Sequence, residues 1–242
     1  MSSIGSQAAV TIENSRLYEQ LAAQAVKTNT LSRFFPPAVV KHLSETEIVT
    51  TDTEITALFS DISAFTAMSA RMSPRQVVEL LNEYFPNMVD IVFKYDGTLE
   101  KYIGDALMAV WGWPYRRPDD PGRAVKAAIL MQRAMKALNG MKGASNRFEI
   151  HIGINSGPVA AGNIGSDKYI QYATIGDTTN VAARACGCAQ EGQIVITDRT
   201  YQLLEQDRFP IEDAGTHQVK GKDRPLQLYR VLWEEAPRNM DE

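Results

Sequence analysis

Two stretches of sequence decide the fold: Ile55-Thr-Ala-Leu-Phe-Ser-Asp-Ile-Ser-Ala-Phe-Thr66 and Gly97-Thr-Leu-Glu-Lys-Tyr-Ile-Gly-Asp-Ala-Leu-Met-Ala-Val-Trp111. In each, one aspartate, Asp61 or Asp105, interrupts an apolar run of the kind that forms a β-strand. An ionised carboxylate inside such a run is unfavourable unless a cation pairs with it. Proteins hold Mg²⁺ with one or two carboxylates together with substrate phosphates. Either aspartate alone could be a turn or capping residue, but the two together favour a metal site.

The composition of the 242-residue chain is that of an ordinary globular protein, with 44% hydrophobic and 22% charged residues. Its net charge of −4 gives no electrostatic reason to expect a nucleic-acid partner. No apolar run approaches the roughly 18 residues that could span a bilayer. Cys186 and Cys188 are too close together for an ordinary structural disulfide, so we expect a reducing, cytoplasmic location.

Apolar periodicity and turn residues predict alternating strands and helices. Strands are expected at Glu54–Ser60, Thr98–Ile103, Ala106–Gly112, Phe148–Asn155, Pro158–Ile164, Gln171–Ile175 and Gln193–Ile196, with three more near Phe209, Gln218 and Leu226–Leu232. Helices are expected from Ser73-Pro74 to about Tyr95, over Asp119–Asn139, from about Thr178 to Gln190 and over Asp198–Leu204. This order indicates an α+β fold, a ferredoxin-like mixed and largely antiparallel sheet with helices packed on one face.

Three local signals refine this prediction. The pair Gly104-Asp105 predicts a tight hairpin turn that exposes the Asp105 carboxylate at its tip. The pair Ser156-Gly157 predicts a second hairpin turn. Pro86, inside the apolar pattern of the first long helix, predicts a kink or a break there.

Four motifs in the chain resemble the catalytic domain of class III nucleotidyl cyclases. They are Phe59-Ser-Asp-Ile-Ser-Ala-Phe-Thr66, Glu100-Lys-Tyr-Ile-Gly-Asp-Ala-Leu-Met108, His151-Ile-Gly-Ile-Asn-Ser-Gly157 and Ile175-Gly-Asp-Thr-Thr-Asn-Val-Ala-Ala-Arg184, and the resemblance covers roughly residues 50–233. It implies two Mg²⁺ or Mn²⁺ ions per active site, held by Asp61, Asp105 and the backbone carbonyl of Ile62. The implied reaction is attack of a ribose 3′-hydroxyl on the α-phosphorus of a nucleoside triphosphate, with release of pyrophosphate.

The same resemblance assigns residues that would bind the substrate. Asn180 and Arg184, four apart on one helix face, match the ribose-orienting asparagine and the arginine that stabilises the transition state. Val219-Lys-Gly-Lys222 matches a segment that supplies a phosphate-binding lysine; Lys220 aligns better and Lys222 is the alternative. The backbone amides of Ser63, Ala64, Phe65 and Thr66 begin a helix and would cradle phosphates.

Base choice depends on Lys101, four residues before Asp105. Adenine N1 accepts a hydrogen bond from a lysine, whereas guanine N1 carries a hydrogen and would need the glutamate that guanylate cyclases of the family have there. The partner position holds Ala173 instead of the usual Asp or Thr, which leaves the carbonyl of Thr174 to accept from the adenine amino group. His151 stands where some relatives carry arginine, and we interpret it as a structural strand residue.

In the family, the metal aspartates come from one protomer and the equivalents of Asn180, Arg184 and Lys101 from the other. A chain that carries both sets implies a homodimer with two equivalent sites. Residues 6–33 lack Pro and Gly and predict a helix, packed on its own domain or paired as a coiled coil between protomers. Gln7–Gln20 resembles the last helix of a GAF sensor domain, so we expect an upstream sensor domain in a longer signalling protein.

These inferences give a domain order and a function. We expect a signalling helix over residues 1–33, a connector over 34–53, the catalytic domain over 54–233 and a tail over 234–242. The expected function is an adenylate cyclase that converts ATP into 3′,5′-cyclic AMP and pyrophosphate by two-metal catalysis. The alternatives are a guanylate or dual-specificity cyclase, and a catalytically silent dimerisation or nucleotide-sensing module.

Overall fold

The computed structural model describes residue 40 and residues 50–141, 147–166, 169–205, 208–222 and 224–237. The chain divides into two units, Met1–Glu47 and Ile48–Glu242, and almost every described residue belongs to the second. The predicted helix over residues 6–33, with its resemblance to a GAF domain, lies outside the described residues. So do most of the predicted connector and tail. No helix in the described part is long and apolar enough to cross a membrane.

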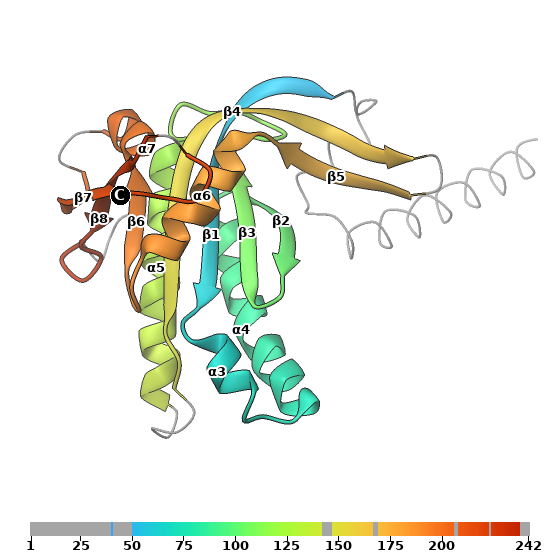
Figure 1. Cartoon of the computed structure of the whole chain (residues 1–242), viewed down its shortest axis with the longest axis vertical. Helices are drawn as coiled ribbons and strands as arrows, with labels where there is room; N and C mark the ends of the chain where they lie inside the picture. The colour runs from blue at the N-terminus through green and yellow to red at the C-terminus, as the bar shows by residue number, and fades with distance from the viewer. Residues whose placement is uncertain are drawn as a thin grey trace, which may run out of the picture. The chain divides into compact units, whose positions relative to one another are not determined.

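A mixed eight-stranded sheet forms the centre of the described unit (Figure 1). Its strand order is β2-β3-β1-β4-β6-β8-β7, and β5 pairs with β4 outside this path. The strands are β1 (Thr51–Ile62), β2 (Thr98–Ile103), β3 (Ala106–Trp111), β4 (Ile150–Ser166), β5 (Tyr169–Ile175), β6 (Ile194–Thr197), β7 (Ile211–His217) and β8 (Leu226–Val231). β4 and β6 run parallel and the other pairs antiparallel, which confirms the predicted fold class.

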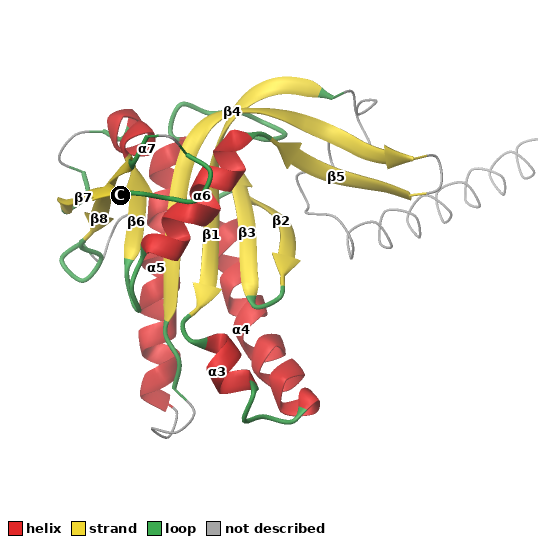
Figure 2. Cartoon of the chain, viewed as in Figure 1, coloured by secondary structure: helices red, strands yellow, loops and turns green. Residues whose placement is uncertain are grey.

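Two long helices, α4 (Pro74–Lys94) and α5 (Asp120–Met141), bury their apolar sides in the main core under one face of the sheet. Ser73 caps α4 through a reciprocal capping box with Gln76, as the sequence Ser-Pro suggests. The short helices are α3 (Phe65–Ser69) and α7 (Asp198–Leu203). Figure 2 shows the helices and strands of these layers in separate colours.

The helix α6 (Asp177–Cys188) packs on the opposite face of the sheet from α5. Ile152 and Ile154 of β4 point into the core shared with α4 and α5. Gly153 lies between them and faces α6, where a Cβ on it would come within 2.0 Å of the Cys186 backbone nitrogen. Successive strand residues point to opposite faces. The helices therefore cover both faces, which corrects the expectation that they cover one.

The strand β1 is central and is buried on both faces. All six residues from Ile55 to Ser60 are buried. β1 pairs with β3 on one side and with β4 on the other, so that Asp61 lies opposite His151. A strand covered on both faces has a nearly continuous apolar sequence. The apolar run before Asp61 therefore indicates a central strand.

The predicted hairpin at Ser156-Gly157 is wrong, because β4 is one continuous strand through both residues. Ser156 and Gly157 pair with Thr56 and Ile55 of β1. A Cβ on Gly157 would lie 2.7 Å from the Thr178 hydroxyl, so this glycine permits a close approach of α6 and is not part of a turn. The actual hairpin partner is β5, whose Tyr169 pairs with Ser166.

Two smaller predictions also need correction. Pro86 lies inside an unbroken helix α4, so the predicted break is wrong, while the predicted kink stays a prediction. It is on the exposed side, where water can satisfy the carbonyl of Asn82 that loses its helical partner. The strands expected near Phe209 and Gln218 are a single strand, β7, so the end of the chain has two strands instead of three. By contrast, the Gly104-Asp105 turn is confirmed, with Gly104 at φ 66° and Ile103 paired with Ala106.

The contact between Gly153 and α6 predicts a sharp effect of one added methyl group. We expect Gly153→Ala to lower the free energy of unfolding by about 1–3 kcal/mol, because the new Cβ meets helix backbone, which cannot rotate away. Urea unfolding measures this change. Gly187→Ala is the matched control, since a Cβ there, on the exposed side of the same helix, meets nothing within 4 Å. Equal stability of the Gly153→Ala and Gly187→Ala proteins would contradict the packing described here.

Candidate active site

The two predicted carboxylates come together at one end of the central strands. Asp61 lies near the end of β1, and Asp105 is in the turn between β2 and β3. Partial burial and the neighbouring Asp61 carboxylate raise the pKa of Asp105 from 3.8 to about 6. The Asp61 side chain is 40% exposed and accepts a hydrogen bond from the backbone amide of Ile62, at 3.1 Å. The two carboxylates thus lie close together and are partly open to solvent.

The donor set at this end of the sheet suits a hard divalent cation. Two carboxylates that repel each other are stabilised by a metal ion between them. No group of three or more His, Cys, Asp or Glu side chains gathers anywhere in the described ranges. Substrate phosphates and water would therefore have to complete the coordination, as is usual for Mg²⁺.

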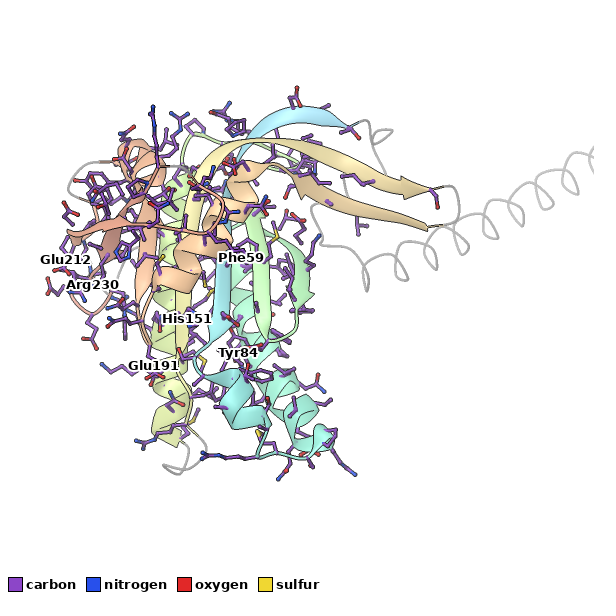
Figure 3. All side chains as sticks on the ribbon, viewed as in Figure 1. Phe59, Tyr84, His151, Glu191, Glu212 and Arg230 are labelled. Atoms are coloured by element: carbon purple, nitrogen blue, oxygen red, sulfur yellow. The ribbon has the colours of Figure 1, made fainter. Side chains whose placement is uncertain are left out.

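His151 and Tyr84 flank this end of β1, as Figure 3 shows. The Nε2 atom of His151 lies 3.9 Å from Asp61 Oδ2, and its Nδ1 atom is 3.1 Å from the Ser63 hydroxyl. Burial lowers the pKa of His151, so the neutral imidazole is favoured. On the other side, the buried Tyr84 hydroxyl bonds to Ser60 Oγ at 2.9 Å. His151 is thus in contact with the acidic pair. From the sequence, this histidine was interpreted only as a structural strand residue.

The segment from Ser63 to Thr66 leads from the end of β1 into the first turn of α3. The Ser63 amide donates to the carbonyl of Glu149 at 2.8 Å, so it is already used and cannot serve a phosphate as expected. Ala64 adopts a left-handed conformation, with φ 55°, and Phe65 begins α3. Ser63 and Ala64 border a hollow of about 1060 Å³ between α3, α4 and residues 147–149. Of the four predicted amides, those of Ala64, Phe65 and Thr66 remain as candidates.

A second group of predicted residues gathers on α6. Asn180 is exposed, and Arg184 lies one turn further along. The Nη1 atom of Arg184 is buried without a hydrogen-bond partner among the described residues. A Cβ on Gly221 would come within 3.2 Å of Arg184 Nη2, so the segment Val219–Lys222 covers this guanidinium.

The two candidate lysines of that segment have different surroundings. Lys222 forms an ion pair with Asp177 at the start of α6. Lys220 is exposed and makes neither an ion pair nor a hydrogen bond within the part of the chain that is described. Within the described part of the chain, the ammonium group of Lys220 is therefore free, whereas that of Lys222 is engaged.

A third group surrounds Lys101, on β2. Its Nζ atom lies 3.2 Å from Glu100 Oε1, and the Thr174 hydroxyl donates to Glu100 Oε2. Ala173 is buried and supplies no polar side chain. Sequence reasoning missed Glu100, although this residue is a third charge, beside Lys101 and Asp105, inside the otherwise apolar run Gly97–Trp111.

The family of the chain follows from a comparison with known proteins. Residues 48–232 match the family described as the adenylate and guanylate cyclase catalytic domain. This chain belongs to that family. It is therefore a class III nucleotidyl cyclase catalytic domain.

Both kinds of cyclase are among its relatives. Adenylate cyclase 1 of Rhizobium meliloti is 32% identical over 182 residues, which are 74% of this chain and 27% of that protein. Receptor-type guanylate cyclase gcy-28 of Caenorhabditis elegans is 31% identical over 217 residues, which are 86% of this chain and 16% of that protein. The cyclase chain thus spans about a quarter or less of the length of these two relatives.

Solved cyclase structures give the same picture. The adenylyl cyclase CyaB from P. aeruginosa superposes with a TM-score of 0.74 at 35% identity, over 78% of this chain and 98% of that one. The guanylyl cyclase Cya2 superposes with a TM-score of 0.70 at 34% identity, over 75% and 93%. Because the two kinds match about equally well, the base that this cyclase accepts has to be argued from its own side chains.

The paired aspartates of the cyclase predict an unusual effect of Asp105→Asn on stability. Removing one charge should raise the free energy of unfolding in metal-free buffer at pH 7.5 by about 1 kcal/mol, a value reduced for the partial exposure of the site. Added Mn²⁺ should stabilise the wild-type protein but not the variant. Thermal unfolding with EDTA and with excess Mn²⁺ measures both effects.

Asp52→Asn, at the exposed start of the same β1 strand, is the control. It should change neither the stability in EDTA nor the stabilisation by Mn²⁺. An Asp105→Asn protein that is less stable than wild type in EDTA would show that the two carboxylates do not repel each other.

Proposed function

We propose that this cyclase is an adenylate cyclase, which converts ATP into 3′,5′-cyclic AMP and pyrophosphate. The observation that carries the proposal is Lys101 at the base-reading position, with its ammonium beside the buried carboxylate of Glu100. A lysine ammonium only donates hydrogen bonds. It complements adenine N1, an acceptor, and opposes guanine N1, which carries a hydrogen.

Asp61, Asp105 and the carbonyl of Ile62 would hold the two Mg²⁺ or Mn²⁺ ions. When bound, the metals would favour loss of the proton from the ribose 3′-hydroxyl and neutralise the triphosphate. The pKa of Asp105, which is raised by burial and then by the neighbouring Asp61 carboxylate, supports this assignment. His151, in contact with Ser63 and near Asp61, would keep the Asp61 carboxylate oriented.

The residues on and near α6 would act on the substrate itself. Arg184 would stabilise the negative charge that builds on the α-phosphoryl oxygens, and its unpaired buried Nη1 atom supports this role. Asn180 would orient the ribose. Lys220 would bind the triphosphate, together with the backbone amides of Ala64, Phe65 and Thr66.

The active site would be shared between the two protomers of a homodimer. Exposed large apolar side chains directly follow the base-reading residues in the sequence: Tyr102 and Ile103 follow Lys101, and Ile175 follows Thr174 and is 55% exposed. A second copy of the chain would cover them and would add its own Asp61 and Asp105 to the site of its partner. Cytoplasmic ATP would be the substrate, and the predicted helix over residues 6–33 would transmit a signal from an upstream sensor domain.

A guanylate or dual-specificity cyclase is the second candidate. The buried, apolar Ala173 favours it, because it provides no side chain that could select the adenine amino group. A silent nucleotide-sensing module is less well supported. Asp61, Asp105, Asn180 and Arg184 are all present, and in a silent module we would expect at least one of them to be lost.

Turnover of ATP and GTP, each with Mg²⁺ and with Mn²⁺, tests the proposal. We expect cyclic AMP as the main product, with kcat/KM for ATP at least about tenfold above that for GTP. Arg184→Ala should lower kcat by about 100-fold or more, which ties the product to this site. Specific activity should fall on dilution, as the dimer dissociates.

Three results would contradict parts of the proposal. Cyclic GMP as the main product would show that Ala173 outweighs Lys101. No cyclic product from a folded, dimeric protein would favour the silent module. Specific activity that is constant on dilution to a demonstrated monomer would exclude a shared site.

A further inference from the structure

We propose that Glu100 is a positioning residue that sets the purine selectivity of this cyclase, an inference that rests on the proposed function. Its side chain is only 1% exposed, whereas that of Lys101 is 31% exposed. Both carboxylate oxygens have partners: Oε1 pairs with the Lys101 ammonium at 3.2 Å, and Oε2 accepts from the Thr174 hydroxyl. A buried carboxylate is tolerated only with such partners, so the three side chains form one unit.

An irregularity in the sheet brings Glu100 and Lys101 to the same place. Leu99 pairs with Ala109 and Lys101 with Met108, so Glu100 is an extra residue, a β-bulge without a partner on β3. Consecutive residues of a regular strand point to opposite faces and their side chains do not meet. A bulge redirects a side chain, and bulges are frequent next to active sites. The ion pair between these neighbours is therefore a consequence of the bulge.

Glu100 also joins two strands that the sheet leaves apart. β2 is at one edge of the strand order, and β5 pairs with β4 alone. Lys101 is on β2 and Thr174 on β5, and the carboxylate of Glu100 holds both. With Ala173 apolar, Glu100 and Thr174 supply the polar groups beside Lys101. The distance between the two candidate base-reading residues, Lys101 and Thr174, thus depends on Glu100.

This arrangement would favour adenine in two ways. First, the carboxylate of Glu100 restrains the ammonium group of Lys101, which ends a long, flexible side chain. The remaining ammonium hydrogens then point in a limited set of directions, toward an acceptor such as adenine N1. Second, Lys101 and Thr174 already engage both oxygens of Glu100, which makes this carboxylate a poorer acceptor for the N1 hydrogen of guanine. Loss of either partner would weaken the preference for ATP.

The experiment compares kcat and KM for ATP and GTP in Glu100→Gln and in the wild-type chain. Glutamine keeps the shape and can still accept from Thr174, but it cannot hold the Lys101 ammonium by charge. We expect KM for ATP to rise about tenfold with kcat within about twofold, and the ATP-to-GTP ratio of kcat/KM to fall about tenfold. Thr174→Val, which frees one oxygen of Glu100, should lower the same ratio about threefold by raising activity with GTP.

A merely structural role predicts a different pattern. It would lower kcat and stability for both nucleotides together and leave the ATP-to-GTP ratio unchanged. Glu212→Gln is the matched control, since Glu212 is paired with Arg230 on the strands β7 and β8 and should leave the ratio as it is. If Glu100→Gln does not fold, Thr174→Val decides alone.

The outcomes separate this inference from the function on which it rests. A folded wild-type chain without activity toward either nucleotide would overturn the proposed function and this inference with it. An active wild-type chain whose ATP-to-GTP ratio is the same in Glu100→Gln and Thr174→Val would overturn this inference and leave the proposed function intact.

Discussion

Repulsion between the Asp61 and Asp105 carboxylates is the constraint on which the rest of the site depends. The chain brings Asp61 to the end of a strand buried on both faces, and then returns through a two-residue turn that delivers Asp105 beside it. Burial of Asp105, and after it the neighbouring Asp61 carboxylate, raise the pKa of Asp105 to about 6. A fold that maintains such a cost usually gains a function from it, and here the gain would be a place for divalent cations and a triphosphate.

The long strand β4 runs from the end of the sheet that carries Asp61 to β5, which carries one of the residues that would read the base. It pairs His151 with Asp61 near one end and Ala161 with Thr174 further along. At about 3.3 Å per residue these two pairings are separated by a path of roughly 33 Å along the strand. Between them Gly153 and Gly157 allow α6 to lie directly on β4. The position of Asn180 and Arg184 therefore depends on two glycines that have no chemical role of their own.

Much of this arrangement could be predicted from the sequence, because the decisive signals are local. The apolar run around Asp61 and the Gly104-Asp105 turn each specify their own backbone. The errors arise where the meaning of a residue depends on a distant neighbour. Gly157 looks like a turn residue until α6 is placed above it. Glu100 looks like an exposed strand residue until the bulge and Thr174 are known, and the amide of Ser63 looks free until Glu149 is placed beside it.

The most direct test of a site shared between two chains is complementation between two inactive variants. Asp105→Asn removes the metal-binding half and Arg184→Ala removes the other half, so neither variant alone should make cyclic nucleotide. In a mixed dimer, isolated through a different tag on each chain, one of the two sites has both intact halves. A shared site predicts about half of the wild-type activity per mixed dimer. Mixed dimers as inactive as either parent would contradict it.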